Sequence, residues 1–132
     1  MPGKRFLLDT NAIVALLQGH SGLAAMTDGA AWLGISVISA LEFSGFPGLT
    51  DADRALFAEF ASRVEVIDLT FTDQALIETI GTLRRSRALK LPDAIILATA
   101  SVNQAVLLTQ YEQLLRQSGV VAGVAVRSFA LT

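Results

Sequence analysis

Short apolar runs and amphipathic stretches alternate along this chain, and the alternation constrains its fold more than any other feature. The apolar runs have the length of buried strands and lie at residues 5–8, 32–38, 64–67, 105–108 and 124–129. Between them, apolar residues recur at helical spacing in residues 11–18, 21–28, 39–46, 51–62, 72–88 and 110–117, and in a helix that starts at Leu91. Strands that alternate with helices are typical of a mainly parallel sheet covered on both faces. We therefore predict an α/β fold: a single three-layer domain over residues 1–132 with a mainly parallel twisted sheet.

The composition excludes several classes of functional site. The chain has no cysteine, which excludes disulfides, thiolate metal sites and cysteine nucleophiles. Its only histidine is His20, so a multi-histidine zinc site is excluded and a Ser-His-Asp triad would have to use this residue. We interpret His20 as a surface or turn residue. Hydrophobic residues make up 52% of the chain, and so much apolar surface in a small domain favours a protein partner or a homodimer.

The apolar segments are too short for export or membrane insertion. Only three apolar residues, Phe6 to Leu8, precede Asp9, which is too few for the apolar core of a signal peptide. The longest apolar stretch, residues 94–108, is broken by polar residues and falls short of the roughly 20 residues that cross a bilayer. We therefore expect a cytoplasmic protein without membrane contact.

Three carboxylates stand at strand ends or early in helices, each flanked by apolar sequence. Asp9 follows the first strand, Glu42 lies in the helix after the second, and Asp93 lies in the first turn of the helix that starts at Leu91. Ligands of such sheets bind beyond the carboxyl ends of the strands. A bound cation would offset the cost of placing acids among apolar residues, and Mg²⁺ prefers carboxylate oxygens. A metal held this way can activate water for phosphodiester hydrolysis, which needs neither histidine nor cysteine.

Each acid also has a purely structural interpretation, and these alternatives stay open. Asp9 is a favoured residue for the N-cap of the first helix. Residues 39–42 (SALE) form a capping box as they stand, with Ser39 at the cap and Glu42 three residues later. Asp93 follows Pro92 in a first turn, where the helix dipole favours a negative charge.

Three segments resemble the motifs of a known family. Residues 6–12 (FLLDTNA) resemble the opening motif of PIN-domain nucleases. Residues 36–43 (SVISALEF) resemble their second motif, which carries a glutamate, and residues 89–100 (LKLPDAIILATA) closely resemble their third. Size and motif spacing are similar to the VapC-type toxins of toxin–antitoxin pairs. The resemblance covers nearly the whole chain and implies a PIN-like sheet.

The resemblance implies a ribonuclease with a Mg²⁺ or Mn²⁺ site, RNA as substrate and a cognate antitoxin protein as partner. Asp9 and Asp93 would be the principal metal ligands, and Glu42 would complete the acidic cluster directly or through water. Thr10 and Asn11 would either orient Asp9 or its bound water, or cap the first helix. Thr109, which follows the fourth strand, is counted with them as a supporting residue.

The chain departs from the family pattern after the fourth strand. The family usually has Thr-x-Asp or Thr-x-Asn there, whereas Thr109 is followed two residues later by Tyr111. Glu112 is a possible fourth acid if the turn shifts by one residue, and otherwise an exposed helix residue. A missing fourth group would weaken a second metal site, and it favours an alternative function: a catalytically weak or inactive PIN module that binds RNA or a protein.

The charge distribution bears on RNA binding, and the basic residues have two interpretations. The net charge of −2 argues against a nucleic-acid binder, which usually carries a basic patch. Residues 84–90 nevertheless hold four of the ten basic side chains: Arg84, Arg85, Arg87 and Lys90. They would contact RNA phosphates, or they would simply complement the dipole at a helix C-terminus.

Overall fold

The structure is a computed structural model that describes residues 3–119 and 124–129. Residues 1–2, 120–123 and 130–132 of the predicted domain lie outside the described residues. In chain order the described elements are β1 (Arg5–Leu8), α1 (Thr10–Leu17), α2 (Ser21–Thr27), β2 (Trp32–Ser36), α3 (Val37–Ser44), α4 (Asp51–Arg63), β3 (Glu65–Ile67), α5 (Gln74–Arg87), α6 (Leu91–Val102), β4 (Val106–Leu108), α7 (Glu112–Leu115) and β5 (Val126–Arg127). Most agree with the predicted elements to within a few residues, while α7 and β5 are shorter than predicted.

The five strands form one parallel sheet in the order β3-β2-β1-β4-β5, which confirms the predicted α/β fold. Leu8 at the end of β1 is level with Ile35 on β2 and with Leu108 on β4. The carboxyl ends of these three neighbouring strands therefore meet at one edge. Asp9 directly follows β1 and Thr109 directly follows β4. These two residues therefore lie side by side, although 100 positions separate Asp9 from Thr109 in the chain.

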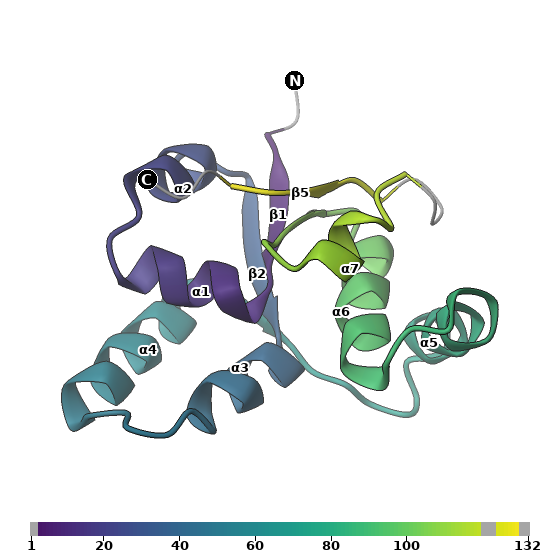
Figure 1. The fold of residues 1–132 in the computed structure, drawn as a ribbon, viewed down its shortest axis with the longest axis horizontal. Coiled ribbons are helices and arrows are strands. Elements are labelled where there is room, and N and C mark those ends of the chain that lie inside the picture. Colours follow the sequence, from purple (N-terminus) through teal and green to yellow (C-terminus); the bar gives the residue numbers. More distant parts are fainter. Residues whose placement is uncertain (1–2, 120–123, 130–132) are drawn as a thin grey trace.

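Helices cover both faces of the sheet, as Figure 1 shows. Side chains alternate between the faces of a strand, so Phe6 and Leu8 of β1 point to one side and Leu7 to the other. Phe6 and Leu8 pack into a core with residues of α1 to α4, and Leu7 packs into a core with residues of α5, α6 and α7. The predicted three-layer arrangement is thus present, with one apolar core on each side of the sheet.

The junction between β2 and α3 corrects the predicted boundaries. The strand was expected to run to residue 38 with the helix beginning at Ser39, but the helix begins at Val37. Its N-cap is Ser36, whose hydroxyl accepts a hydrogen bond from the backbone N–H of Ile38 at 3.1 Å. Ser39 is therefore inside the helix, and the predicted capping box of Ser39 and Glu42 is wrong.

His20, predicted to be a surface or turn residue, is half-buried and has a capping role that was not predicted. His20 is the N-cap of α2, where its Nδ1 accepts a hydrogen bond from the backbone N–H of Leu23 at 2.9 Å. Its ring packs edge-on against the ring of Phe129 at 5.5 Å. The Nε2 atom is buried although His20 as a whole is half-buried, so this residue is a partly exposed cap that follows the turn at residues 18–19.

Among the described residues, no helix combines the length and the apolar character needed to cross a membrane.

Candidate acidic active site

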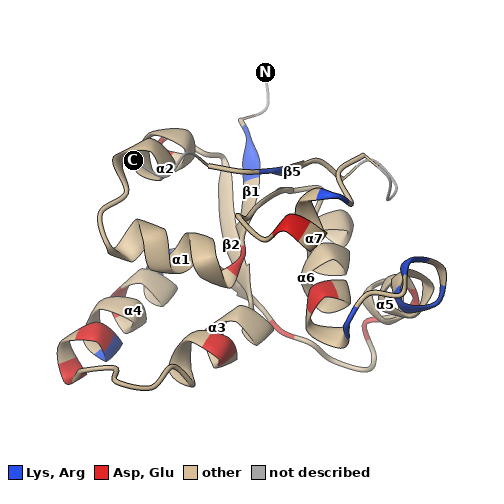
Figure 2. Ribbon diagram, viewed as in Figure 1, with Lys and Arg blue, Asp and Glu red and all other residues tan. Residues whose placement is uncertain are grey.

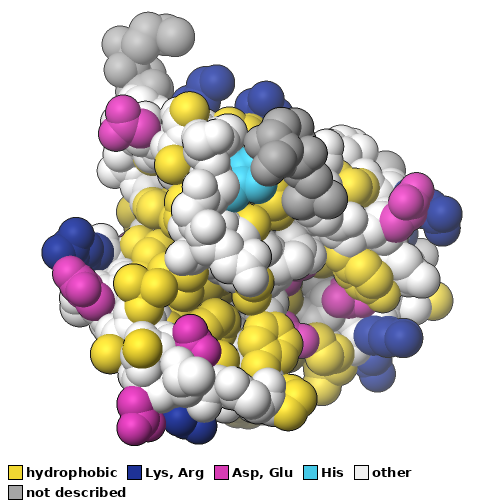
Figure 3. Space-filling view, turned by 60° about the vertical axis from the view of Figure 1, so that its left-hand side comes forward, with side chains coloured by type: hydrophobic (Ala, Val, Ile, Leu, Met, Phe, Trp, Pro, Cys, Tyr) yellow, Lys and Arg dark blue, Asp and Glu magenta, His cyan; other side chains and the backbone are white. Residues whose placement is uncertain are grey.

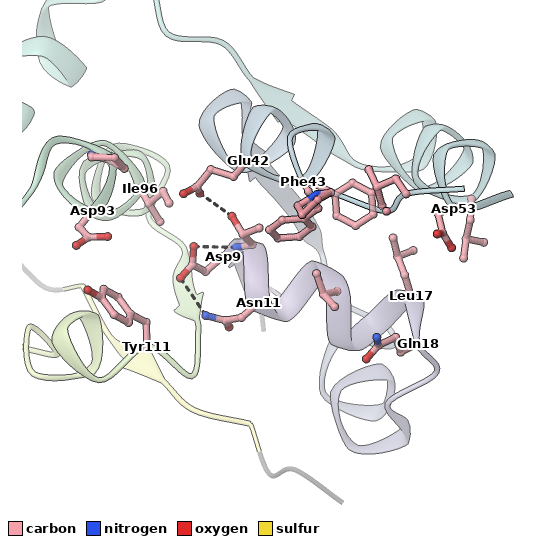
Figure 4. A pocket seen from close by; sticks show the side chains of 18 of the residues that line it. Asp9, Asn11, Leu17, Gln18, Glu42, Phe43, Asp53, Asp93, Ile96 and Tyr111 are labelled. Atoms are coloured by element: carbon pink, nitrogen blue, oxygen red, sulfur yellow. Dashed lines mark hydrogen bonds between the residues drawn. The ribbon is translucent and has the colours of Figure 1, made fainter. Parts of the chain in front are cut away.

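The three acids predicted from the sequence line one pocket of about 990 Å³. Asp9 enters it from the end of β1, Glu42 from the middle of α3, and Asp93 from the first turn of α6. Figure 4 shows their carboxylates around the same opening. The fold therefore gathers acids that are far apart in the sequence at the carboxyl edge of the sheet, where ligands of such sheets bind.

Asp9 is buried and held by three hydrogen bonds. Its Oδ1 accepts from the backbone N–H of Thr10 at 2.8 Å. Its Oδ2 accepts from the hydroxyl of Thr109 at 2.7 Å and from the side-chain amide of Asn11 at 3.4 Å. The bond from Thr10 makes Asp9 the N-cap of α1. The side chain of Asp9 therefore caps α1 and also lines the pocket, so the two interpretations of this residue do not exclude each other.

Glu42 is oriented by Thr10 across the pocket. The hydroxyl of Thr10 donates to Oε1 of Glu42 at 2.7 Å, which links α1 to α3. Thr10 was expected to orient Asp9, and its backbone N–H donates a hydrogen bond to that carboxylate. Its hydroxyl instead donates to Glu42. One residue thus fixes the positions of two carboxylates.

Asn11 and Thr109 join the start of α1 to the loop after β4. The Asn11 amide donates to Oγ1 of Thr109 at 3.2 Å, and its carbonyl oxygen accepts from the backbone N–H of Gln110 at 3.0 Å. Oγ1 of Thr109 also accepts from the backbone N–H of Tyr111 at 2.9 Å. With its own proton donated to Asp9, the buried Thr109 hydroxyl uses its full hydrogen-bonding capacity. Asp9 is therefore held in one orientation by a closed network.

The electrostatics of the pocket disfavour the ionised forms of Asp9 and Asp93. Burial raises the pKa of Asp9, and the nearby charges of Glu42 and Asp93 raise it further, while the hydrogen bonds from Thr109 and Thr10 act in the opposite direction. Burial and the charge of Glu42 also raise the pKa of Asp93, against a lowering by Lys90. Carboxylates that repel one another in a partly dry pocket gain stability when a cation binds between them.

The donor set fits a hard divalent cation. All the ligating atoms offered by the three acids are carboxylate oxygens, and within the described residues nothing hydrogen-bonds the carboxylate of Asp93. As placed, no three acidic or histidine side chains of the described part of the chain converge closely enough to ligate one ion together. Mg²⁺ needs only one or two protein carboxylates and keeps several waters, so this spacing suits it.

The remaining predicted residues are divided between the pocket and the outer surface. Lys90 lines the pocket beside Asp93, whereas Arg84, Arg85 and Arg87 lie in the last turn of α5. The guanidinium of Arg84 donates to the backbone oxygen of Leu89. Figure 2 shows the basic residues of α5 at the outer edge of the molecule. Glu112 is exposed and is not among the described residues that line the pocket.

The same pocket has an apolar arm that was not predicted from the sequence. The arm is lined by side chains of α1, α3, α4 and the α3–α4 loop, including Leu17, Phe46, Leu49 and Leu56. Figure 3 shows apolar side chains gathered on this side of the molecule, with acidic ones between them. Phe46 and Leu56 are 41% and 46% exposed, and Phe46 is followed by the turn-forming pair Pro47 and Gly48, the one sequence signal that marks this loop.

The family model described as PIN domain matches residues 6–118. A toxin–antitoxin complex from Klebsiella pneumoniae contains a chain with 28% identity and a TM-score of 0.69, and the match covers 90% of this chain and 94% of that one. A comparison with curated proteins finds no significant match.

Two further solved structures share the fold at lower identity. VapBC2 from Rickettsia felis, bound to a DNA fragment from its promoter, has 18% identity and a TM-score of 0.72, with coverage of 96% of this chain and 99% of that one. DNA-bound VapBC from Salmonella typhimurium has 22% identity and a TM-score of 0.67, with coverage of 95% and 98%.

Proposed function

The chain belongs to the PIN domain family, and on this basis we propose that it is a Mg²⁺- or Mn²⁺-dependent endoribonuclease that hydrolyses RNA phosphodiesters. The observation that carries the proposal is the gathering of Asp9, Glu42 and Asp93 in one pocket, where burial and mutual repulsion raise the pKa of Asp9 and Asp93. Acids in a pocket whose pKa is raised by burial and by neighbouring charges are candidates for catalytic or metal-binding roles.

Each pocket residue has a defined task in this proposal. Asp9 and Asp93 hold the ion, and Glu42 reaches it directly or through water. When bound, the ion lowers the pKa of a coordinated water and polarises the phosphate. Asn11 and Thr109 keep Asp9 in a fixed orientation, and Thr10 does the same for Glu42.

Lys90 is the basic residue best placed to meet the substrate. It lines the pocket next to Asp93 and lowers the pKa of that acid, so a phosphate that enters the pocket comes within reach of a positive charge. Arg84, Arg85 and Arg87 continue the basic surface along α5 and would contact phosphates farther along the strand. Such contacts position RNA without reading its sequence.

We further propose that the protein is the toxin of a type II toxin–antitoxin pair, acting in the cytoplasm. The likeness to a chain of the Klebsiella pneumoniae toxin–antitoxin complex supports this role. The exposed apolar residues of the pocket arm, such as Phe46 and Leu56, are suited to a segment of an antitoxin or to a second copy of this chain. Growth arrest on expression of the chain alone, relieved by a small protein encoded next to it, would support the assignment; normal growth would contradict it.

One observation favours a second function. Tyr111 occupies the pocket wall where the resemblance leads one to expect an acid or an amide, and Glu112 does not line the pocket. A PIN module that binds RNA or a protein without cleaving RNA would tolerate this change.

A cleavage assay on single-stranded RNA separates the two functions. We expect the purified chain to cleave RNA with Mg²⁺ or Mn²⁺, and we expect EDTA or Asp93→Asn to abolish cleavage. Glu112→Gln is the matched control, because it makes the same acid-to-amide change at an exposed position outside the pocket. Cleavage that persists in EDTA would contradict the metal mechanism, and RNA binding without cleavage would favour the binding module.

A further inference from the structure

We propose that the acidic pocket holds one divalent ion per chain, and that Tyr111 is the residue that keeps a second ion out. The proposal rests on the proposed metal-dependent function and specifies its stoichiometry. It follows from the hydrogen bonds of Asp9 and from the group that faces Asp93.

Asp9 has capacity for a single metal contact. An ionised carboxylate offers about four lone-pair positions, two on each oxygen. On Oδ2 both positions are taken, by the hydroxyl of Thr109 and the amide of Asn11. On Oδ1 one position is taken by the backbone N–H of Thr10. One position remains, so Asp9 can contact one ion but cannot bridge two ions.

Among the described residues, the wall beyond Asp93 offers no further acid. Two-metal sites hold their ions about 3.5–4 Å apart, and the carboxylates around them must offset four positive charges. Here three acids line this part of the pocket: Asp9, Glu42 and Asp93. Figure 4 shows the hydroxyl end of Tyr111 directed toward Asp93, on the side away from Glu42. A phenol brings neither the charge nor the bidentate oxygens that a second ion requires.

The position of Tyr111 is fixed by the backbone. Its N–H donates to the hydroxyl of Thr109, and its backbone oxygen accepts from the N–H groups of Leu114 and Leu115 in α7. Tyr111 as a whole residue is 36% exposed, and it lines the pocket. Because the backbone is held from both sides, a substituted side chain at 111 will project from the same point of the wall.

Counting bound Mn²⁺ tests the proposal without reference to activity. The free Mn²⁺ signal in electron paramagnetic resonance, measured during titration of the purified chain and checked by calorimetry, gives the number of tight sites. We expect one for the natural chain and none for Asp93→Asn. We expect two for Tyr111→Glu, which places a carboxylate opposite Asp93.

Two substitutions control for the loss of the ring and its hydroxyl. Tyr111→Gln has the shape of the glutamate variant without its charge, and Tyr111→Phe keeps the ring; both should retain one ion. Circular dichroism establishes that each variant is folded. Two tight ions in the natural chain would overturn the proposal, and so would a folded Tyr111→Glu variant that binds only one. No tight ion in the natural chain would instead contradict the proposed metal-dependent function itself.

Discussion

At the scale of single residues, the geometry of the pocket depends most on the side chains that hydrogen-bond the acids. Thr109 is a buried hydroxyl that donates to Asp9 and accepts from Asn11 and from the backbone of Tyr111. The sequence places Thr109 at a strand end, but it cannot show that one oxygen serves three partners from two segments 100 positions apart. That information comes from the register between β1 and β4.

Replacing Thr109 with valine should impair both stability and ion binding. Valine keeps the shape but leaves the Tyr111 N–H without its acceptor and takes from the Asn11 amide one of its two acceptors. The expected cost is about 1–3 kcal/mol in the free energy of unfolding. Loss of a residue that orients a metal ligand typically weakens metal affinity about 10–100-fold. Urea unfolding and Mn²⁺ calorimetry measure the two effects. Thr109→Ser keeps the hydroxyl and should stay close to the natural protein; a valine variant that also does so would contradict the assigned role.

Asp93→Asn should have the opposite effect on stability, while it removes ion binding. Burial and the charge of Glu42 raise the pKa of Asp93, so its ionised form opposes folding. We expect the variant to be more stable at neutral pH by up to about 0.5 kcal/mol, because the side chain is partly exposed and solvent screens the repulsion.

The pH dependence of this difference follows from the sign of the shift. A raised pKa means that the folded state holds the proton more tightly, so the natural protein regains stability as the pH falls through the raised value toward 3.8. The advantage of the asparagine variant should therefore be present at neutral pH and vanish in acid. Urea unfolding across this pH range measures it. An asparagine variant less stable than the natural protein at neutral pH would contradict the repulsion.

At the scale of elements, the junction after β2 decides where Glu42 points. The capping box of Ser39 and Glu42 is a sound local pattern, yet the helix starts two residues earlier at Val37, with Ser36 as its cap. Two sequence positions competed for the same role, and sheet register decided between them, since Ser36 pairs with Ile67 of β3 and so still belongs to the strand. The carboxylate of Glu42 therefore takes no part in capping α3, and it accepts a hydrogen bond from the hydroxyl of Thr10.

Gly34 of β2 is the position where this element should be most sensitive to substitution. A Cβ on Gly34 would overlap the ring of Trp32 on the same strand. That ring has little room to move, because its N–H donates to Glu65 and the guanidinium of Arg5 lies 4.6 Å from its centroid. We expect Gly34→Ala to cost about 1–3 kcal/mol, the range typical of overpacking.

Thermal or urea unfolding measures this cost, and Gly45→Ala provides the comparison. At Gly45, which ends α3, an added Cβ meets its nearest atom at an ordinary contact distance of 3.5 Å. The two glycine variants make the same chemical change on neighbouring elements. Equal stabilities for the two would show that the Trp32 ring gives way easily, contrary to the packing described here.

At the scale of the whole molecule, the order of elements and the gathering of the acids could be predicted from the sequence. Alternating patterns gave the parallel sheet, and the carboxyl-edge rule placed Asp9 and Thr109 together. The apolar arm of the pocket could not be predicted in this way, because it combines side chains from α1, α3, α4 and a loop whose relative positions depend on packing. The capping role of His20 and its packing against Phe129 could not be predicted for the same reason.

The central claim is that this gathered pocket binds a divalent ion, and a crystal soaked in Mn²⁺ tests it most directly. We predict one peak in the anomalous difference map, within the pocket, with Asp9 and Asp93 both near enough to contact the ion or its waters. A map with no peak there, or with peaks only at exposed acids such as Glu112, would contradict it.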